Sequence, residues 1–333
     1  MGRRFINQLE DRESVNEVYQ VSEKKLRPNR NGDLYLQVQL SDRTGAITAR
    51  LWNASQELYT SFEDGDFLKV EGRAQLYQGE MQIIATRLKT IDGEHIKHAD
   101  FVPQADQDMD QLIQKFQSLL RSIENPPLRN LVDCFLMDEE FMAKFTKAPA
   151  GVKNHHAYWG GLLEHVFTIM QMVDRIKPLY PQLDRDLLLM GAFLHDLGKI
   201  DELSYLCGFG YTDHGQLVGH IVIAIGILQK QVDKAEQLSG EPFPPELLLQ
   251  LQHLIVSHHG QYEFGSPKLP MTLEAVALCQ LDNLDAKLHS FHQLMKEDPN
   301  TDSPWTLYHP SIDRKLYKGG STAPAESLEE PTS

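Results

Sequence analysis

Histidine and aspartate side chains are concentrated in the middle of the sequence, at spacings suited to metal binding. Nine of the fourteen histidines lie between His155 and His259. Imidazole and carboxylate without thiolate favour first-row ions such as Mn, Fe, Ni or Zn. Two such ions about 3.5–4 Å apart can hold a phosphodiester and activate a water between them. The candidate metal ligands are His165, His195, Asp196, His220, His258, His259 and Asp282.

These ligands occur in an ordered set of motifs. The segments HHAYWGGLLEHV, FLHDLGK, VGHI, SHHG and LDNLDAK cover residues 155–166, 193–199, 218–221, 257–260 and 281–287. Together they resemble the HD-domain superfamily of metal-dependent phosphohydrolases. The resemblance implies that Asp196 bridges two ions and has a catalytic role. His165, His195 and Asp282 would hold the first ion with it, and His220, His258 and His259 the second. A single ion, with the last three histidines structural, is the alternative.

Lys199 is a candidate catalytic residue. It follows His195 by four residues, so both side chains lie on one face if this segment is helical. An ammonium group there can contact a non-bridging phosphate oxygen as charge develops in the transition state. The alternative is a lysine that interacts with the negative end of the helix dipole.

The remaining histidines in this region have less specific surroundings. His155 and His156 either contact a phosphate or end a helix. We interpret five others as structural: His214, His253, His289, His292 and His309.

Apolar residues with a helical period surround the candidate ligands. From about residue 109 onwards the hydrophobic spacing predicts an all-α domain. Helices are expected at Met109–Ile123, Pro127–Leu136, Glu139–Lys147, Gly160–Lys177, Arg185–Leu197, Gln216–Leu238, Pro245–Ser257 and Leu273–Lys296.

The first hundred residues instead alternate between apolar and polar side chains, which is typical of strands. Inward residues are expected to include Leu34, Leu36, Ile47, Leu68 and Leu76. Five strands with a helix between the third and fourth form the layout of an oligonucleotide-binding (OB) barrel. The expected strands are Asn16–Leu26, Asp33–Asp42, Gly45–Trp52, Asp66–Tyr77 and Glu80–Leu88, with a Gln78-Gly79 turn and a short helix at Ala54–Phe62.

Aromatic and basic side chains alternate on the predicted outer face of this barrel. Such a surface stacks single-stranded bases at about 1–3 kcal/mol each and tolerates any sequence. The alternatives are ordinary surface aromatics, or a Trp52 that seals one end of the barrel. The candidate nucleic-acid-binding residues are Tyr35, Arg50, Trp52, Lys69, Arg73 and Tyr77.

Charge and cysteine content restrict the class of protein. The net charge is −15, but residues 1–100 carry 14 Lys/Arg against 16 Asp/Glu, so nucleic-acid contact is easier to place there. Cys134, Cys207 and Cys279 are odd in number and far apart. This argues against a disulfide framework or a zinc knuckle and favours the reducing cytoplasm. No stretch approaches 18 apolar residues and no secretory signal begins the chain, so no membrane association is expected.

An OB barrel joined to an HD domain resembles the YhaM family of 3′–5′ exoribonucleases. The resemblance runs from about Val15 to Leu288, with HHAYWGGLLEHV and GSPKLP (265–270) as its most specific parts. It implies stepwise release of nucleotides from the 3′ ends of single-stranded RNA, and also single-stranded DNA, by metal-activated water attack with two ions, usually Mn²⁺. Two alternatives remain open: a phosphodiesterase or phosphatase for a small nucleotide, and a non-enzymatic single-strand-binding or replication-accessory protein. The oligomeric state, including a homo-oligomer, is also open.

The predicted architecture is therefore a multidomain β + α chain. It has an OB-fold domain at residues 1–95, a linker at 96–110, an all-α HD domain at 111–312 and a disordered tail at 313–333.

Overall fold

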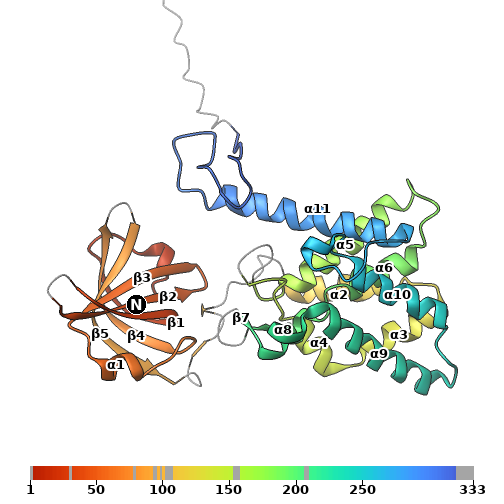
Figure 1. The fold of residues 1–333 in the computed structure, drawn as a ribbon, viewed down its shortest axis with the longest axis horizontal. Helices are drawn as coiled ribbons and strands as arrows, with labels where there is room; N and C mark the ends of the chain where they lie inside the picture. Colours follow the sequence, from red (N-terminus) through yellow and green to blue (C-terminus); the bar gives the residue numbers. More distant parts are fainter. Residues whose placement is uncertain are drawn as a thin grey trace, which may run out of the picture.

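The N-terminal strands close into a barrel in the computed structural model, which describes residues 3–29, 32–77, 80–92, 96–97, 100–101, 108–152, 158–205 and 210–319. The strand order is β1-β2-β3-β5-β4, and β4 pairs with β1 to complete the barrel. Neighbouring strands are antiparallel except for β3 and β5, which are parallel (Figure 1). The bounds are β1 (Ser14–Pro28), β2 (Leu34–Asp42), β3 (Gly45–Trp52), α1 (Gln56–Thr60), β4 (Phe67–Tyr77) and β5 (Glu80–Ile91), preceded by the 3₁₀ turn η1 (Ile6–Gln8). The predicted OB layout is confirmed.

The barrel core follows the predicted alternation except at two strand ends. Leu36, Ile47 and Leu68 are almost fully buried. Leu34 and Leu76 were predicted to point inward, but they are 38% and 54% exposed. Leu34 begins β2 and Leu76 lies next to the end of β4, so both extend past the closed part of the barrel. The predicted Gln78-Gly79 turn lies outside the described residues.

The rest of the described chain is mainly helical. A second hydrophobic core unites these helices and shares no residue with the barrel core among the described residues. The bounds are α2 (Met109–Leu120), α3 (Pro126–Leu136), α4 (Glu139–Phe145), α5 (Gly161–Ile176), α6 (Arg185–Leu194), α7 (Lys199–Glu202), α8 (Asp213–Val218), α9 (His220–Ser239), α10 (Pro245–Ser257), η4 (Tyr262–Phe264) and α11 (Leu273–Lys296), with a small hairpin of β6 (Leu203–Ser204) and β7 (Gly210–Tyr211). In the described part of the chain, no helix is long and apolar enough to cross a membrane.

Two predicted helices are each divided in the structure. The segment predicted as Arg185–Leu197 ends at Leu194 and a short α7 follows. The segment predicted as Gln216–Leu238 is split into α8 and α9 at Gly219, whose φ of +78° favours glycine. Both breaks place a candidate ligand at a helix end.

The C-terminal segment is ordered further than predicted. The tail was expected to begin at residue 313, but bridges join His309 to Arg314 and Trp305 to Tyr317. The buried Asp298 carboxylate accepts hydrogen bonds from Lys318 Nζ and Leu307 N, both at 2.9 Å. These contacts keep residues up to Lys318 in folded structure.

Candidate metal centre and nucleic-acid interface

Five helices bring the predicted ligands to one point in the helical domain. His165 lies within α5 and Asp282 within α11. His195 is the residue at which α6 ends, and Asp196 follows it. The α9 helix starts at His220. His258 ends α10, with His259 next to it.

The Asp196 carboxylate lies at the centre of this cluster. Its Oδ2 atom is 3.5 Å from His165 Nε2 and 3.4 Å from His195 Nε2. Its Oδ1 atom is 3.6 Å from His220 Nε2 and 3.7 Å from His258 Nε2. Each carboxylate oxygen therefore faces a different pair of imidazoles, which is the arrangement that a bridging ligand requires.

The other ligand atoms divide into two groups on either side of Asp196. One group is His165, His195 and Asp282, and the other is His220, His258 and His259; within each group the candidate ligand atoms lie within 4.8 Å of one another. The structure therefore brings together all seven residues that the sequence singled out.

Backbone carbonyls fix the orientation of three imidazoles. Nδ1 of His195 lies 2.9 Å from Ala192 O, and Nδ1 of His258 lies 2.6 Å from Ile255 O. His259 Nδ1 is 2.8 Å from Phe264 O. Because a carbonyl only accepts, each Nδ1 carries the proton and leaves the Nε2 lone pair directed into the cluster.

The side chains of this cluster are chemically suited to hold a divalent metal ion. The Nε2 atoms of His195, His220 and His258 are buried and have no hydrogen-bond partner in the described part of the chain. Burying several polar atoms without partners is unfavourable. Neutral imidazoles beside carboxylates are the ligands that Mn, Fe, Ni and Zn accept, so the residues present fit such an ion.

Sequence reasoning missed two carboxylates that contact the Nδ1 atoms of candidate ligand histidines. Asp285 Oδ2 is 2.7 Å from His165 Nδ1. Glu202 Oε1 is 3.2 Å from His220 Nδ1 and also accepts from the His220 backbone N–H at 3.0 Å. Asp285 could have been found from the sequence, because it follows Asp282 by three residues in one helix and therefore lies near it on the same face. Glu202 lies in the stretch after FLHDLGK, where no pattern marked it.

Burial and neighbouring charge determine the protonation states. Burial alone would raise the pKa of Asp196, but Lys199 and His195 hold it well below its usual range. Burial lowers the pKa of His258 and of His259, which keeps both rings neutral and able to bind metal. Burial opposes charge on Lys199 too, but Asp196 raises its pKa. The Lys199 ammonium lies 2.6 Å from Asp196 Oδ2.

Backbone contact between helices sets the position of His220 relative to the His195-Asp196 pair. A Cβ atom at Gly198 would lie 1.9 Å from His220 O, closer than any side chain can approach. Similarly, a Cβ at Gly215 would lie 2.2 Å from Glu202 O. Glycine is therefore required where α7 meets the start of α9 and the α8 helix.

Comparison with known proteins agrees with this geometry. Residues 162–287 match the HD domain model and residues 18–91 match a model of an OB-fold nucleic acid binding domain. The chain is 35% identical over 268 residues to the 3′–5′ exoribonuclease YhaM of Geobacillus sp. (strain WCH70), covering 80% of each chain. It is 36% identical over 267 residues to YhaM of Bacillus subtilis (strain 168), covering 80% of this chain and 82% of the relative. This chain belongs to the YhaM family.

The other candidate residues of this YhaM-family chain lie away from the cluster or outside the described residues. His214 is exposed on α8. His253 Nε2 accepts a hydrogen bond from Met271 N at 2.9 Å. His155 and His156 fall outside the described residues.

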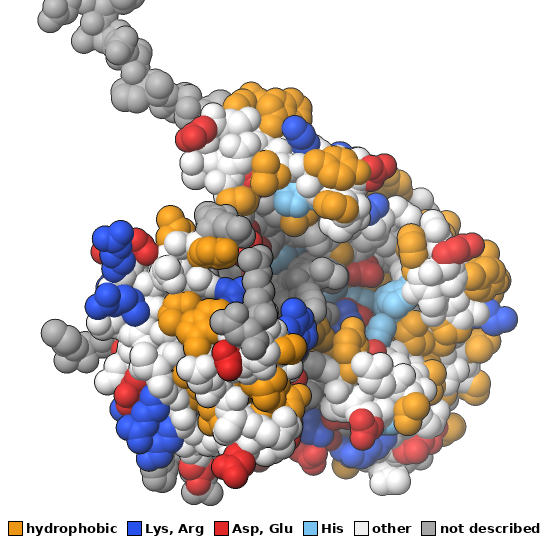
Figure 2. Space-filling model, turned by 60° about the vertical axis from the view of Figure 1, so that its left-hand side comes forward, with side chains coloured by type: hydrophobic (Ala, Val, Ile, Leu, Met, Phe, Trp, Pro, Cys, Tyr) orange, Lys and Arg blue, Asp and Glu red, His pale blue; other side chains and the backbone are white. Residues whose placement is uncertain are grey.

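The barrel of this YhaM-family chain carries the predicted aromatic and basic residues on its outer surface. Tyr35 pairs with Trp52 across β2 and β3, and their ring centroids are 5.1 Å apart. Trp52 is 48% exposed, so it does not seal the barrel end. Tyr77, the last residue of β4, is 53% exposed and lies at some distance along the sheet from this ring pair. Figure 2 shows hydrophobic and basic side chains close together on the barrel, and histidines in a recess of the surface.

Proposed function

We propose that this chain is a metal-dependent 3′–5′ exoribonuclease that shortens single-stranded RNA by hydrolysing its terminal phosphodiester. The observation that carries the proposal is the buried Asp196, whose two oxygens face separate pairs of imidazoles. Within the described residues, the buried Nε2 atoms of His195, His220 and His258 have no hydrogen-bond partner. The two YhaM relatives are named for this activity.

The division of the ligands supports two ions per chain, with Asp196 shared. His165, His195 and Asp282 would hold one ion, and His220, His258 and His259 the other. Bound divalent ions polarise the phosphate and lower the pKa of a water, which supplies the nucleophile at neutral pH. Imidazole and carboxylate ligands suit Mn, Fe, Ni or Zn. Among these we propose Mn²⁺, the ion that the resemblance to the YhaM family implies.

The protein's own groups position this chemistry. Asp285 and Glu202 hold the rings of His165 and His220 through their Nδ1 atoms. Lys199 balances the charge of the buried Asp196 carboxylate, at 2.6 Å. Because its ammonium group contacts that carboxylate, the half-buried Lys199 is also our candidate for stabilising negative charge on the phosphate oxygens in the transition state.

In this proposal the barrel binds the single-stranded RNA. We assign base stacking to Tyr35, Trp52 and Tyr77, and phosphate contact to Arg50 and Arg73. Stacking is indifferent to the sugar, so single-stranded DNA is a further substrate under this proposal.

The test is digestion of a 5′-labelled single-stranded RNA in the presence of Mn²⁺, Mg²⁺, Ni²⁺ or Zn²⁺ in turn. We expect a ladder of products that shortens from the 3′ end, strongest with Mn²⁺, and no cleavage of the same RNA with a blocked 3′ end. Cleavage of a cyclic dinucleotide without a ladder from RNA would contradict the proposal and favour a small-nucleotide phosphodiesterase.

A further inference from the structure

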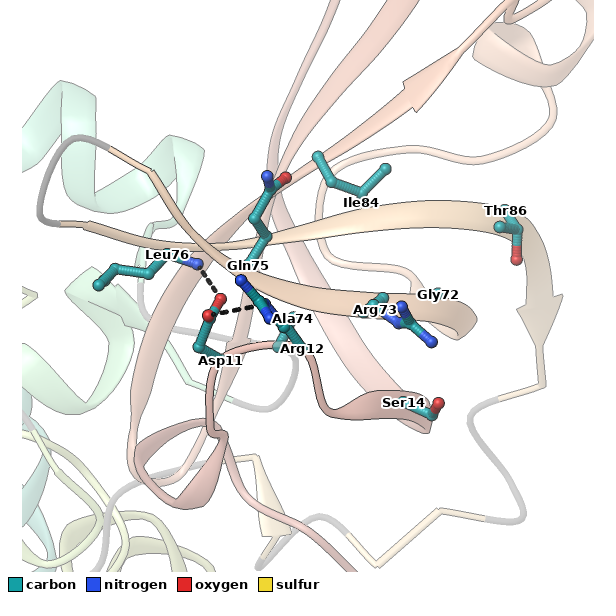
Figure 3. Close-up of a pocket in the computed structure, with 10 residues that line it drawn as sticks. All are labelled: Asp11, Arg12, Ser14, Gly72, Arg73, Ala74, Gln75, Leu76, Ile84 and Thr86. Carbon is teal, nitrogen blue, oxygen red and sulfur yellow. Dashed lines mark hydrogen bonds and ion pairs between the residues drawn. The ribbon is translucent and has the colours of Figure 1, made fainter.

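The barrel has a pocket on the side formed by β1, β4 and β5, away from the Tyr35–Trp52 pair. This pocket is partly open to solvent and has a volume of about 690 Å³. Figure 3 shows its lining residues. Arg12 and Arg73 line it together with the Asp11 carboxylate, the Gln75 amide, and apolar and hydroxyl side chains. The lining residues are Asp11, Arg12, Ser14, Gly72, Arg73, Ala74, Gln75, Leu76, Ile84 and Thr86.

Strand register connects this pocket to the residues assigned to RNA. Arg50 on β3 pairs with Ile84 on β5, and Ile84 pairs on its other side with Arg73 on β4. Arg73 in turn pairs with Ser14 on β1. Their chain neighbours Ala49, Ile83 and Ala74 are buried in the barrel, so this row points outward. Arg50 and Arg73 are two strands apart, or roughly 10 Å. Cations therefore flank an apolar side chain in a continuous row across β3, β5 and β4.

The charges along this row are available to an anion. Arg50 and Arg73 have no carboxylate within ion-pair distance in the part of the chain that the structure describes. Arg12 is 85% exposed and its Nε atom is 3.5 Å from Asp11 Oδ2. Asp11 is in turn held by Leu76 N at 2.8 Å, which keeps its carboxylate at one end of the pocket.

Backbone contacts hold Arg12 at the rim. Its N–H donates to Ala74 O at 2.9 Å, and Ala74 N donates to Glu13 O at 2.8 Å. Arg12 has φ of +66°, a left-handed conformation that is unfavourable for a non-glycine residue. Gly72 adds to the shape of the pocket, because a Cβ there would lie 2.4 Å from Ile84 O.

We propose that this pocket is a second subsite for single-stranded RNA, in which Arg73 and Arg12 bind a phosphate and Ile84 supports the adjacent sugar or base. The strand then crosses β5 from the Tyr35–Trp52 pair instead of ending on β2 and β3. Ser14 and Thr86 line the same space. The Thr86 hydroxyl donates to Glu71 O at 3.1 Å, so its oxygen can only accept from the ribose, whereas the Ser14 hydroxyl can donate or accept. This inference rests on the proposed function, because it assumes that RNA occupies the barrel.

The test measures binding of labelled oligouridylates to the full-length protein in chelator, where the strand is not cut. Probes of about 4 and about 16 nucleotides bracket the site sizes of OB folds. For Arg73→Gln we expect the long probe to bind about tenfold more weakly. The slope of log K against log salt concentration should also become shallower by about 0.7, which is the contribution of one phosphate contact on a single strand. The short probe, which the Tyr35–Trp52 pair can hold alone, should change less than about twofold.

Two further variants sharpen the result. Ser14→Glu places a carboxylate beside Arg73 on an exposed strand end and should reproduce the loss while Arg73 remains. Arg129→Gln removes an exposed arginine of α3 and should leave both probes and the salt slope unchanged.

Wild-type affinity and salt slope for both Arg73→Gln and Ser14→Glu would overturn the proposal, and so would equal losses on the short and long probes. Each variant is also tested for shortening of RNA with Mn²⁺. A wild-type protein that fails there contradicts the proposed exoribonuclease, whereas altered binding alone bears only on the pocket.

Discussion

The Asp196 side chain is the residue on which the proposed chemistry depends most. Asp196→Asn keeps the shape of the side chain but removes the charge shared between the two groups of imidazoles. We expect RNA hydrolysis to fall by at least about 100-fold. Exonuclease assays and metal analysis of the folded variant measure this. A folded, metal-loaded Asp196→Asn protein that turns over at the wild-type rate would rule out the proposed mechanism.

Glu202 is predicted to act through His220 and not on the substrate. Carboxylates that hold a ligand histidine typically contribute 10–100-fold to metal affinity, so Glu202→Gln should weaken binding of one ion by about that factor. Calorimetric titration with Mn²⁺ measures it independently of activity. The matched control is Asp201→Asn, because the neighbouring Asp201 pairs with Lys144 at 3.0 Å and touches no ligand. Equal effects in both variants would contradict the assignment.

His258 separates the two groups of ligands. Its Nε2 atom faces Asp196 Oδ1, on the side of His220 and His259. His258→Ala should therefore lose one ion per chain and most activity while His165, His195 and Asp282 still hold the other. Elemental analysis of wild type and variant checks this. One ion in the fully loaded wild-type protein would make the two-ion model wrong.

The sequence predicted the ligands better than it predicted the groups around them. Histidines and aspartates in ordered motifs are visible without a structure. The contact between Glu202 and His220 joins residues 18 positions apart through a turn at Gly219 that the helical pattern concealed. The ion pair of Lys199 with Asp196 was also outside the prediction, which had placed the ammonium on a phosphate.

At the scale of elements, Asp138 connects two helices, α4 and α9, and is predicted to be important for stability. It caps α4 through Phe141 N at 3.1 Å and accepts from Gln231 and Lys234 of α9 at 2.9 and 2.6 Å. Asp138→Ala should lower the free energy of unfolding by about 2 kcal/mol, and Asp138→Asn, which keeps a capping oxygen, by about 1 kcal/mol. Urea titration measures both.

The same contacts have a pH dependence of known sign. Burial alone would raise the pKa of Asp138, but Lys234, Phe141 N and Gln231 lower it to about 2. A lowered carboxyl pKa contributes stability above the unfolded value of about 3.9, and that contribution is lost as pH falls towards about 2. The difference between wild type and Asp138→Ala should therefore persist down to about pH 4 and shrink below it. A difference that grows on acidification would contradict this role.

Most helices and strands could be predicted from periodicity, and the failures have local causes. Pro245–Ser257 and Leu273–Lys296 have their predicted bounds. The single predicted helix Gln216–Leu238 was wrong because one glycine with positive φ interrupts an otherwise helical pattern. The prediction that Leu34 and Leu76 point into the barrel was wrong because alternation indicates on which face of a strand a side chain lies, but not where the closed part of the barrel ends.

At the scale of the whole molecule, the separate cores predict a division of labour. A chain without residues 1–100 should fold, because the helical core includes no barrel residue among those described. It should still hydrolyse a nitrophenyl phosphodiester but bind long RNA about thirty-fold to twenty-thousand-fold more weakly if two stacked bases are lost. The change should appear in KM, since stacking far from the scissile bond is close to uniform binding. Trp52→Ala in the full chain should reproduce part of it, whereas an unchanged KM would exclude the barrel as the capture site.

The two cores share no residue in the part of the chain that the structure describes. Under the proposed function, the barrel could therefore bind RNA whether or not the helical domain holds its ions. Ion binding stabilises only the body that holds the ions, by about 2.7 kcal/mol at a hundredfold excess over Kd. On heating, manganese should therefore shift the melting of the helical domain and leave that of the barrel in place. A cell short of manganese would contain chains that hold transcripts without digesting them. Such chains would shield 3′ ends from other nucleases until the metal returned.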